Sequence, residues 1–255
     1  MSTTAEQRII LVTGGNNGIG FDTVAALAAA SPTNYVIIGS RNLSKGTAAL
    51  EKIKAKNYPG STDLVQLDVT DDSSIFAAAT SISQTHGRLD VLINNAGICP
   101  EPSDPTWPTR QQMRDVFETN VFGPTVVTQA MLPLLRKSTD PRIVNVTSSL
   151  GSIATRLDPS DQVAGPNYPG YRMSKAALNM LTAYTYALEE AKGVKVWSFC
   201  PGFVVTDLGR DREVRESMGI DSSETSAKGI LQIVQGERDD EVGRFVEREG
   251  KSRAW

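Results

Sequence analysis

The amino-acid sequence predicts an α/β protein: a doubly wound parallel sheet of about seven strands with helices on both faces. Three observations support this fold class. Short apolar runs alternate with helical patterns, the runs are apolar at nearly every residue, and the first run ends in a glycine-rich turn. Strands that alternate with helices form right-handed crossovers between parallel neighbours. Nearly continuous apolar character indicates strands that are buried on both faces of the sheet.

The elements are expected in strict alternation. Runs rich in Val, Ile and Leu predict strands at 8–14, 34–40, 62–68, 89–97, 141–149, 194–202 and 243–249. Amphipathic or alanine-rich stretches predict helices at 18–30, 43–57, 71–86, 110–137, 171–192 and 223–236. The chain has no internal repeat and no interdomain linker, so we expect a single domain that spans 1–255.

Composition and charge exclude several classes of protein. The 255 residues carry a net charge of -3 without a run of Lys or Arg, so nucleic acid is not an expected partner. The first residues lack a basic segment and a cleavage site, and no apolar run approaches the roughly 20 residues that cross a bilayer. We therefore expect a cytoplasmic protein with no membrane partner.

The sequence has few Cys and His side chains that could bind a metal ion. Cys99 and Cys200 have no CxxC partner, and His86 is the only histidine. Two reduced, largely buried thiols are expected. His86 is expected at a helix C-terminus before Gly87, where a histidine suits the helix dipole. No metal is predicted.

The first expected strand runs into TGGNNGIG, residues 13–20, with glycines at 14, 18 and 20. Glycine allows a tight turn and lets backbone amides approach a pyrophosphate at the positive end of the next helix. The spacing GxxxGxG differs from GxGxxG, and Phe21 stands where a phosphate loop for ATP or GTP needs lysine. A purely structural turn is the alternative, but the position in a βαβ unit favours dinucleotide binding.

Several motifs together resemble the classical short-chain dehydrogenase/reductase family, in particular its carbonyl reductases. The family's TGxxxGIG, NNAG and YxxxK occur as TGGNNGIG, as NNAG at 94–97 and as YRMSK at 171–175. LDVT, FETNVFG, IVNVTSSLG and CPGFVVTD also match in order, and the match runs from residue 8 to about 207. The resemblance implies a Rossmann-type fold. It also implies an oxidoreductase that moves a hydride between a nicotinamide and a carbonyl or secondary alcohol, as a ketoreductase or carbonyl reductase.

The resemblance implies four catalytic residues, Asn120, Ser148, Tyr171 and Lys175. Tyr171 would donate the proton, and because a free phenol has a pKa near 10, Lys175 and an oxidised nicotinamide would lower that pKa. Ser148 would hydrogen-bond the substrate oxygen and the tyrosine, with Ser149 as the structural alternative. Asn120 would lie where a helix is disturbed and hold a water that links the lysine to solvent. A helix-interior asparagine with local bonds is the alternative.

The family's cofactor site would follow the carboxyl edge of the sheet. Segment 95–97 would lie along the adenine ribose, Asp68 and Val69 would contact the adenine, and the turn 201–206 would cover the carboxamide and pyrophosphate. A plain strand-ending turn is the alternative for 201–206. The implied cofactor-binding residues are Gly14, Asn16, Asn17, Gly18, Ile19, Gly20, Ser40, Arg41, Asp68, Val69, Asn95, Ala96, Gly97, Tyr171, Lys175, Pro201, Gly202, Val204 and Thr206.

The end of the second expected strand predicts NADP(H) in preference to NAD(H). An NAD site places an acidic residue there, about 20 residues beyond the glycine turn, to bind the ribose hydroxyls. This chain has Ser40 and then Arg41. A hydroxyl and a guanidinium would bind the 2′-phosphate, which a carboxylate would repel. Many NADP-binding relatives also carry a basic residue where this chain has Asn17, so the expected preference is moderate.

The substrate pocket is expected from two proline-rich loops, 99–108 and 152–170, and from the segment after Thr206, because ligands bind at the carboxyl edge of such a sheet. Aromatic candidates for an apolar lining are Trp107, Tyr168 and Phe203, each with ordinary packing as its alternative. The substrate would be a small carbonyl or alcohol.

Two functions other than catalysis by this family are disfavoured by the sequence. A non-catalytic dinucleotide sensor on the same fold is disfavoured because all four catalytic residues are present. An epimerase or dehydratase of the extended relatives is disfavoured by the short chain. The segment between Ser148 and Tyr171 is longer than usual in the family and resembles insertions in carbonyl reductases, which predicts a monomer or homodimer.

Overall fold

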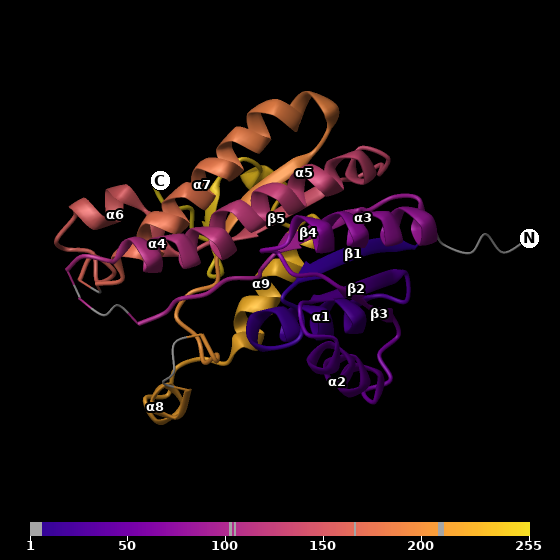
Figure 1. Cartoon of the computed structure of the whole chain (residues 1–255), viewed down its shortest axis with the longest axis horizontal. Helices are drawn as coiled ribbons and strands as arrows, with labels where there is room; N and C mark the ends of the chain where they lie inside the picture. The colour runs from indigo at the N-terminus through magenta and orange to yellow at the C-terminus, as the bar shows by residue number, and fades with distance from the viewer. Residues whose placement is uncertain (1–6, 102–103, 105, 166, 209–211) are drawn as a thin grey trace, which may run out of the picture.

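The computed structural model describes residues 7–101, 104, 106–165, 167–208 and 212–255. Seven parallel strands form one sheet in the order β3-β2-β1-β4-β5-β6-β7 (Figure 1). This confirms the predicted Rossmann-type fold. The strands are β1 Arg8–Thr13, β2 Asn34–Ser40, β3 Ser61–Gln66, β4 Val91–Asn94, β5 Arg142–Val146, β6 Lys195–Cys200 and β7 Phe245–Glu247. Strand order reverses between β1 and β4, and the crevice at such a reversal is the usual ligand site of this fold.

Two helical layers cover the sheet (Figure 1). One contains α1 Gly18–Ala30, α2 Leu43–Lys54 and α9 Ser223–Gln235, and the other contains α3 Asp72–His86, α5 Gly123–Leu135 and α7 Pro169–Glu189. Alternate residues of β1 face the two helical layers: Ile10 packs with α1 and α9, and Leu11 packs with α3 and α5. This division follows from the two-residue period of a strand.

The expected helix at 110–137 is divided into three parts. They are α4 Arg110–Phe117, a π-helical segment η1 Glu118–Phe122, and α5. Two short helices, α6 Ile153–Leu157 and α8 Arg212–Ser217, were not among the expected helices, and α6 lies within the expected loop 152–170. Helices of five or six residues are too short to show a reliable period in the sequence. Short 3₁₀ turns complete the set: η2 Ser149–Gly151, η3 Glu190–Lys192 and η4 Asp239–Glu241.

Several strands end earlier than expected because their last residues turn. β4 stops at Asn94, since the amide of Asn95 donates to Ile93 O at 3.1 Å and to Thr13 Oγ1 at 3.0 Å. His86 is the last residue of α3, before Gly87 with a left-handed φ of 73°, which confirms its expected place.

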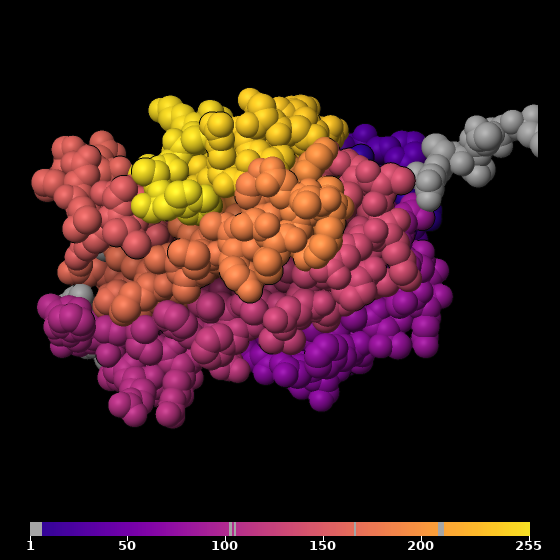
Figure 2. All heavy atoms as spheres, turned by 90° about the horizontal axis from the view of Figure 1, so that it is seen from above, coloured from indigo at the N-terminus to yellow at the C-terminus, as the bar shows by residue number. Residues whose placement is uncertain are grey.

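The C-terminal residues pack beside the segment that contains α6 (Figure 2). Ser152 Oγ donates to Ala254 O at 2.8 Å, and Ala154 N donates to Trp255 O at 3.0 Å. Arg253 Nη1 lies 2.8 Å from Asp161 Oδ2. The end of the chain thereby holds the beginning of the 152–170 loop in place.

No helix among the described residues is long and apolar enough to span a membrane. Within the same residues, no group of three His, Cys, Asp or Glu side chains is arranged to hold a metal ion. Both cysteines are free thiols; Cys200 is buried and Cys99 is half-buried.

Candidate active site

The turn between β1 and α1 forms a cradle that requires glycine. Gly14 and Gly18 have φ values of 64° and 51°, which side chains other than glycine rarely adopt. A Cβ on Gly20 would lie 2.4 Å from Gly14 O and 2.5 Å from Asn95 Nδ2. The side chain of Asn17, the N-cap residue of α1, makes no capping hydrogen bond, whereas Asp71 caps α3. Uncapped amides at a positive helix end, reached through a glycine turn, fit the pyrophosphate of a dinucleotide.

Residues after β4 hold this cradle from the other side. Asn95 Nδ2 donates to Thr13 O at 2.9 Å, and Ala96 N donates to Thr13 Oγ1 at 3.0 Å. The amide of Asn95 is therefore bonded to the protein, where it shapes the cradle. Ile19 and Val69, also predicted at the cofactor site, pack against the two apolar clusters that flank the sheet.

The end of β2 presents one exposed cation. Ser40 is 1% exposed, and its hydroxyl lies 3.2 Å from Asn16 Oδ1 and 3.0 Å from Asn42 O. Because a hydroxyl has only one proton to donate, Ser40 uses it within the protein, for Asn16 or Asn42. The Arg41 side chain is 76% exposed, and its Nε lies 3.9 Å from Asp68 Oδ2. The guanidinium of Arg41 is thus the group that faces solvent at the position where NAD and NADP differ.

The turn after β6 closes on the glycine cradle. Gly202 has a left-handed φ of 75°, and a Cβ there would lie 2.7 Å from Arg248 Nε. Val204 and Thr206 are buried, and a Cβ on Gly18 would lie 3.5 Å from Thr206 Cγ2. The segment that begins at Pro201 therefore returns to the beginning of α1, as a cofactor clamp requires.

Ser148, Tyr171 and Lys175 meet at the carboxyl end of β5. Tyr171 and Lys175 share one face of α7 because they are four residues apart, and Lys175 Nζ lies 5.5 Å from the centre of the Tyr171 ring. Lys175 Nζ donates to Val146 O at 2.8 Å. A side-chain hydrogen bond from Ser148 acts to lower the pKa of Tyr171, whereas the backbone amide of Ser149 donates to Cys200 Sγ at 3.1 Å. The geometry thus favours Ser148 over Ser149 as the partner of the tyrosine.

Burial dominates the electrostatics of this cluster. It raises the pKa of the Tyr171 phenol, against smaller opposite effects of the Ser148 hydrogen bond and the charge of Arg215. It lowers the pKa of Lys175 to about 8. Burial therefore sets the phenol pKa of the protein alone, and the expectation that Lys175 and an oxidised nicotinamide together lower it stays a prediction for the enzyme with its cofactor. Tyr171 is protonated at neutral pH and can donate.

Asn120 lies in the π-helical segment, the disturbed helix that was expected. It is fully buried; its Oδ1 accepts from Ile98 N at 2.8 Å, and its Nδ2 donates to Ile98 O at 2.9 Å and to Ser174 Oγ at 3.1 Å. These partners lie in other elements, so the alternative of local bonding is excluded. A Cβ on Gly97 would lie 3.3 Å from Asn120 Oδ1 and 3.6 Å from Lys175 Nζ, which places Asn120 beside the lysine.

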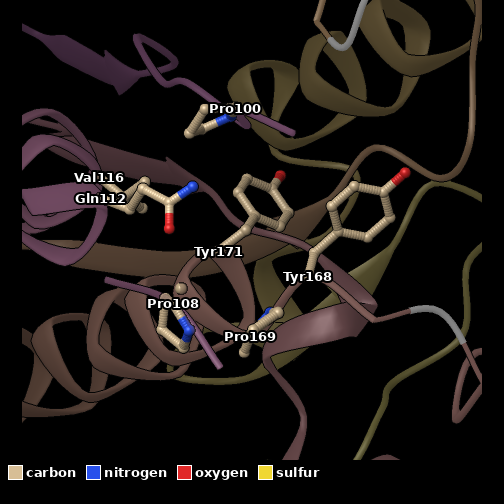
Figure 3. Close-up of a pocket in the computed structure, with 8 residues that line it drawn as sticks. Pro100, Pro108, Gln112, Val116, Tyr168, Pro169 and Tyr171 are labelled. Atoms are coloured by element: carbon tan, nitrogen blue, oxygen red, sulfur yellow. The ribbon is translucent and has the colours of Figure 1, made fainter. Parts of the chain in front are cut away.

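A pocket opens on Tyr171 between the two proline-rich loops (Figure 3). Both loops and α4 contribute to its lining, whereas the segment after Thr206 does not; that this pocket binds the substrate stays a prediction. The lining residues are Pro100, Pro108, Gln112, Val116, Tyr168, Pro169, Gly170 and Tyr171. Of the three aromatic candidates, Tyr168 belongs to this lining, whereas Trp107 and Phe203 are 77% and 60% exposed.

Arg215 of α8 also reaches the site. Its Nη1 donates to Val204 O at 3.3 Å and to Thr206 Oγ1 at 3.4 Å. Nothing in the sequence pattern marks this residue, since it lies in a run of alternating charges that is typical of an exposed surface.

Comparison with known proteins agrees with this geometry. The family profile described as short chain dehydrogenase matches residues 8–217. The short-chain dehydrogenase anuI of Penicillium roqueforti is 37% identical over 246 residues, 94% of either chain. A carbonyl reductase from chicken fatty liver, solved with bound NADPH, has a TM-score of 0.84 and 34% identity, over 98% of this chain and 100% of that one. Carbonyl reductase Sniffer of D. melanogaster has a TM-score of 0.82 and 30% identity over the same shares.

The fold and the site define an oxidoreductase with a dinucleotide cofactor. The chain belongs to the short-chain dehydrogenase/reductase family, and it is similar to the carbonyl reductases within it.

Proposed function

We propose that the whole chain acts as one domain that reduces a ketone or aldehyde to an alcohol with NADPH, and catalyses the reverse oxidation. The observation that carries this proposal is the cluster of Ser148, Tyr171 and Lys175 beneath a pocket with mainly apolar side chains. A phenol that is protonated at neutral pH, beside a hydroxyl, suits a carbonyl oxygen that must gain a proton.

Each residue has a distinct task in this proposal. A bound nicotinamide would supply or accept the hydride. Ser148 and Tyr171 hydrogen-bond the carbonyl oxygen and fix its position, and Tyr171 then gives its proton to that oxygen. Lys175 stabilises the phenolate that remains. Asn120 positions the Ile98 backbone and Ser174 around the lysine through its hydrogen bonds.

The cofactor we propose is NADP(H). Arg41 supports it, because its exposed guanidinium lies at the end of β2, where a 2′-phosphate would need charge-assisted bonds. The chicken carbonyl reductase with bound NADPH is a similar protein and adds support. Arg41 would have to give up its ion pair with Asp68 to bind the phosphate, so we propose only a moderate preference for NADP(H) over NAD(H).

We also propose a cytoplasmic monomer or homodimer. The net charge of -3 without basic runs supports a freely diffusing protein. The long segment between Ser148 and Tyr171 supports a small assembly, as in carbonyl reductases with similar insertions. Light scattering that gave four subunits would contradict this.

The proposed reaction is tested by NADPH consumption with a panel of ketones, aldehydes and quinones. A reductase oxidises NADPH only when a carbonyl compound is present and forms an equal amount of alcohol. A dinucleotide sensor would bind NADPH and consume none.

A further inference from the structure

Arg215 points inward from a helix that is otherwise outside the protein body. Figure 1 shows α8 set apart from both helical layers, and none of its residues is buried. Arg215 is nevertheless half-buried: its guanidinium lies 4.8 Å from the centre of the Phe203 ring and donates to groups of Val204 and Thr206. The residue thus turns from α8 towards the carboxyl edge of the sheet.

Arg215 differs from the other half-buried or buried arginines near the end of the chain. Arg238, Arg248 and Arg253 each form ion pairs with carboxylates, at distances that include 2.6 Å to Asp221 and 2.8 Å to Asp161. Within the described residues, no carboxylate lies within ion-pair distance of Arg215. A half-buried guanidinium that has no carboxylate partner among these residues can pair with the anionic group of a ligand.

The hydrogen bonds of Arg215 leave most of its donors available. A guanidinium has five N–H groups, and both described bonds come from Nη1, at the long distances of 3.3 and 3.4 Å. In the described part of the chain, Nε and Nη2 have no acceptor. A carboxylate could therefore bind in the two-pronged geometry that arginine favours.

Arg215 is also close enough to influence the reacting groups. Its positive charge lowers the pKa of Tyr171 and that of Cys99, against the larger opposite effect of burial on both. Its contacts with Val204 and Thr206 place the guanidinium beside the turn after β6, which returns to the beginning of α1. The pocket that opens on Tyr171 is lined by apolar groups such as Pro100 and Val116.

We propose that Arg215 binds a carboxylate of the substrate, so that the preferred substrates are carbonyl compounds with an apolar body and an acid group near the reacting carbonyl. This inference rests on the proposed reductase function. The apolar pocket would hold the body, Tyr171 the carbonyl oxygen, and Arg215 the acid. The same guanidinium chemistry would also suit the diphosphate of the cofactor, so the experiment must separate these two anions.

The experiment compares an aromatic keto acid with its methyl ester, which has the same carbonyl and no charge. The quantity measured is kcat/KM for the acid divided by kcat/KM for the ester. In Arg215→Met this ratio is expected to fall about 10–100-fold, the value of hydrogen bonds to a charged group. Arg212→Met is the matched control: Arg212 lies on the same helix but is exposed and pairs with Asp207 and Glu216, so the ratio should stay within about twofold.

NADPH binding, measured by fluorescence titration without substrate, separates the sources of the anion. An unchanged dissociation constant in Arg215→Met together with the reduced ratio supports the proposal. Weaker NADPH binding with an equal loss for acid and ester would assign Arg215 to the diphosphate and overturn it. An equal loss with intact NADPH binding and a shifted pH profile would assign the residue to Tyr171 and also overturn it. If the wild type reduced neither compound nor any other carbonyl, the reductase proposal itself would fail.

Discussion

The two ends of the strands differ in how buried charges are paired; we call them the amino edge and the carboxyl edge of the sheet. At the amino ends of β5 and β6, the side chain of Arg142 is 4% exposed and pairs with Asp140 at 2.8 Å and with Asp239. Lys195 joins the same carboxylates, at 2.6 Å from Asp239. At the carboxyl edge, Lys175 is equally buried, but within the described part of the chain it has no carboxylate partner.

The pKa shifts record this difference. The Arg142 hydrogen bond is the main cause that lowers the pKa of Asp239 to about 2, whereas burial lowers the pKa of Lys175 to about 8. Paired charges stabilise the fold, and an unpaired buried charge costs stability. The comparison therefore assigns stability to the amino edge and chemistry to the carboxyl edge, and variants at each edge should affect different measurements.

Tyr171→Phe should have the largest effect, on activity alone. Loss of the ionisable oxygen should lower kcat by about 10²–10⁴, the contribution of general acid catalysis, while the dissociation constant of NADPH stays nearly the same. Steady-state kinetics and NADPH fluorescence measure these quantities. Tyr184→Phe, on the exposed side of α7, is the control. A Tyr171→Phe enzyme that retained more than about a tenth of kcat would show that another group donates the proton.

Lys175→Met should lower activity and raise stability. Activity should fall about 10²–10³-fold, as when one electrostatic donor is removed. The folded pKa of about 8 lies below the ordinary 10.5, so the unfolded chain binds more protons between these values and wild-type stability rises with pH there. The full cost of burial is thus present at pH 7, where the variant should be more stable by about 1–3 kcal/mol.

Denaturant unfolding at pH 7 and at pH 10 measures this advantage, which should shrink at the higher pH. Lys228→Met, at an exposed site on α9, is the matched control and should show no pH-dependent gain. A Lys175→Met variant that is less stable than the wild type at pH 7 would remove the contrast between the two edges.

Arg41→Ala should change the choice of cofactor. Loss of a charge-assisted bond to the 2′-phosphate costs about 1–3 kcal/mol, so kcat/KM with NADPH should fall roughly tenfold or more. The value with NADH should stay nearly the same and serves as the internal control. The proposal for Arg41 would be wrong if the wild type preferred NADH or if the variant kept its NADPH value.

Asp239→Asn should have the smallest effect, on stability alone. Its carboxylate is about one-third exposed, so solvent screening limits the loss to about 1 kcal/mol. The folded pKa of about 2 lies below 3.8, so the contribution is present above pH 3.8 and disappears as the pH falls towards 2. Thermal unfolding at pH 6 and at pH 3 measures this. A clear loss of kcat with intact folding would contradict the claim that the amino edge contributes to stability and not to catalysis.

The fold could be predicted from the sequence because its signals are local. The apolar runs predict the strands, and the glycine motif predicts the tight turn after the first one. The YxxxK spacing brings Tyr171 and Lys175 to one helix face. Other features depend on contacts between distant segments. The π-helical break around Asn120 rests on its bonds to Ile98 and Ser174, and the rise in the Tyr171 pKa rests on burial by the whole site. Arg215 lies in a charged helix, where only the tertiary structure shows its inward direction.

Hydride transfer itself can be observed with NADPH that carries deuterium at both C4 positions. The wild-type protein is incubated with this cofactor and a ketone, and the alcohol is analysed by mass spectrometry. Our account predicts an alcohol with one deuterium on the carbinol carbon, formed at a rate that Tyr171→Phe lowers by about 10²–10⁴. An alcohol without deuterium, or no alcohol from any carbonyl compound despite tight NADPH binding, would contradict the claim that this protein is a nicotinamide-dependent carbonyl reductase.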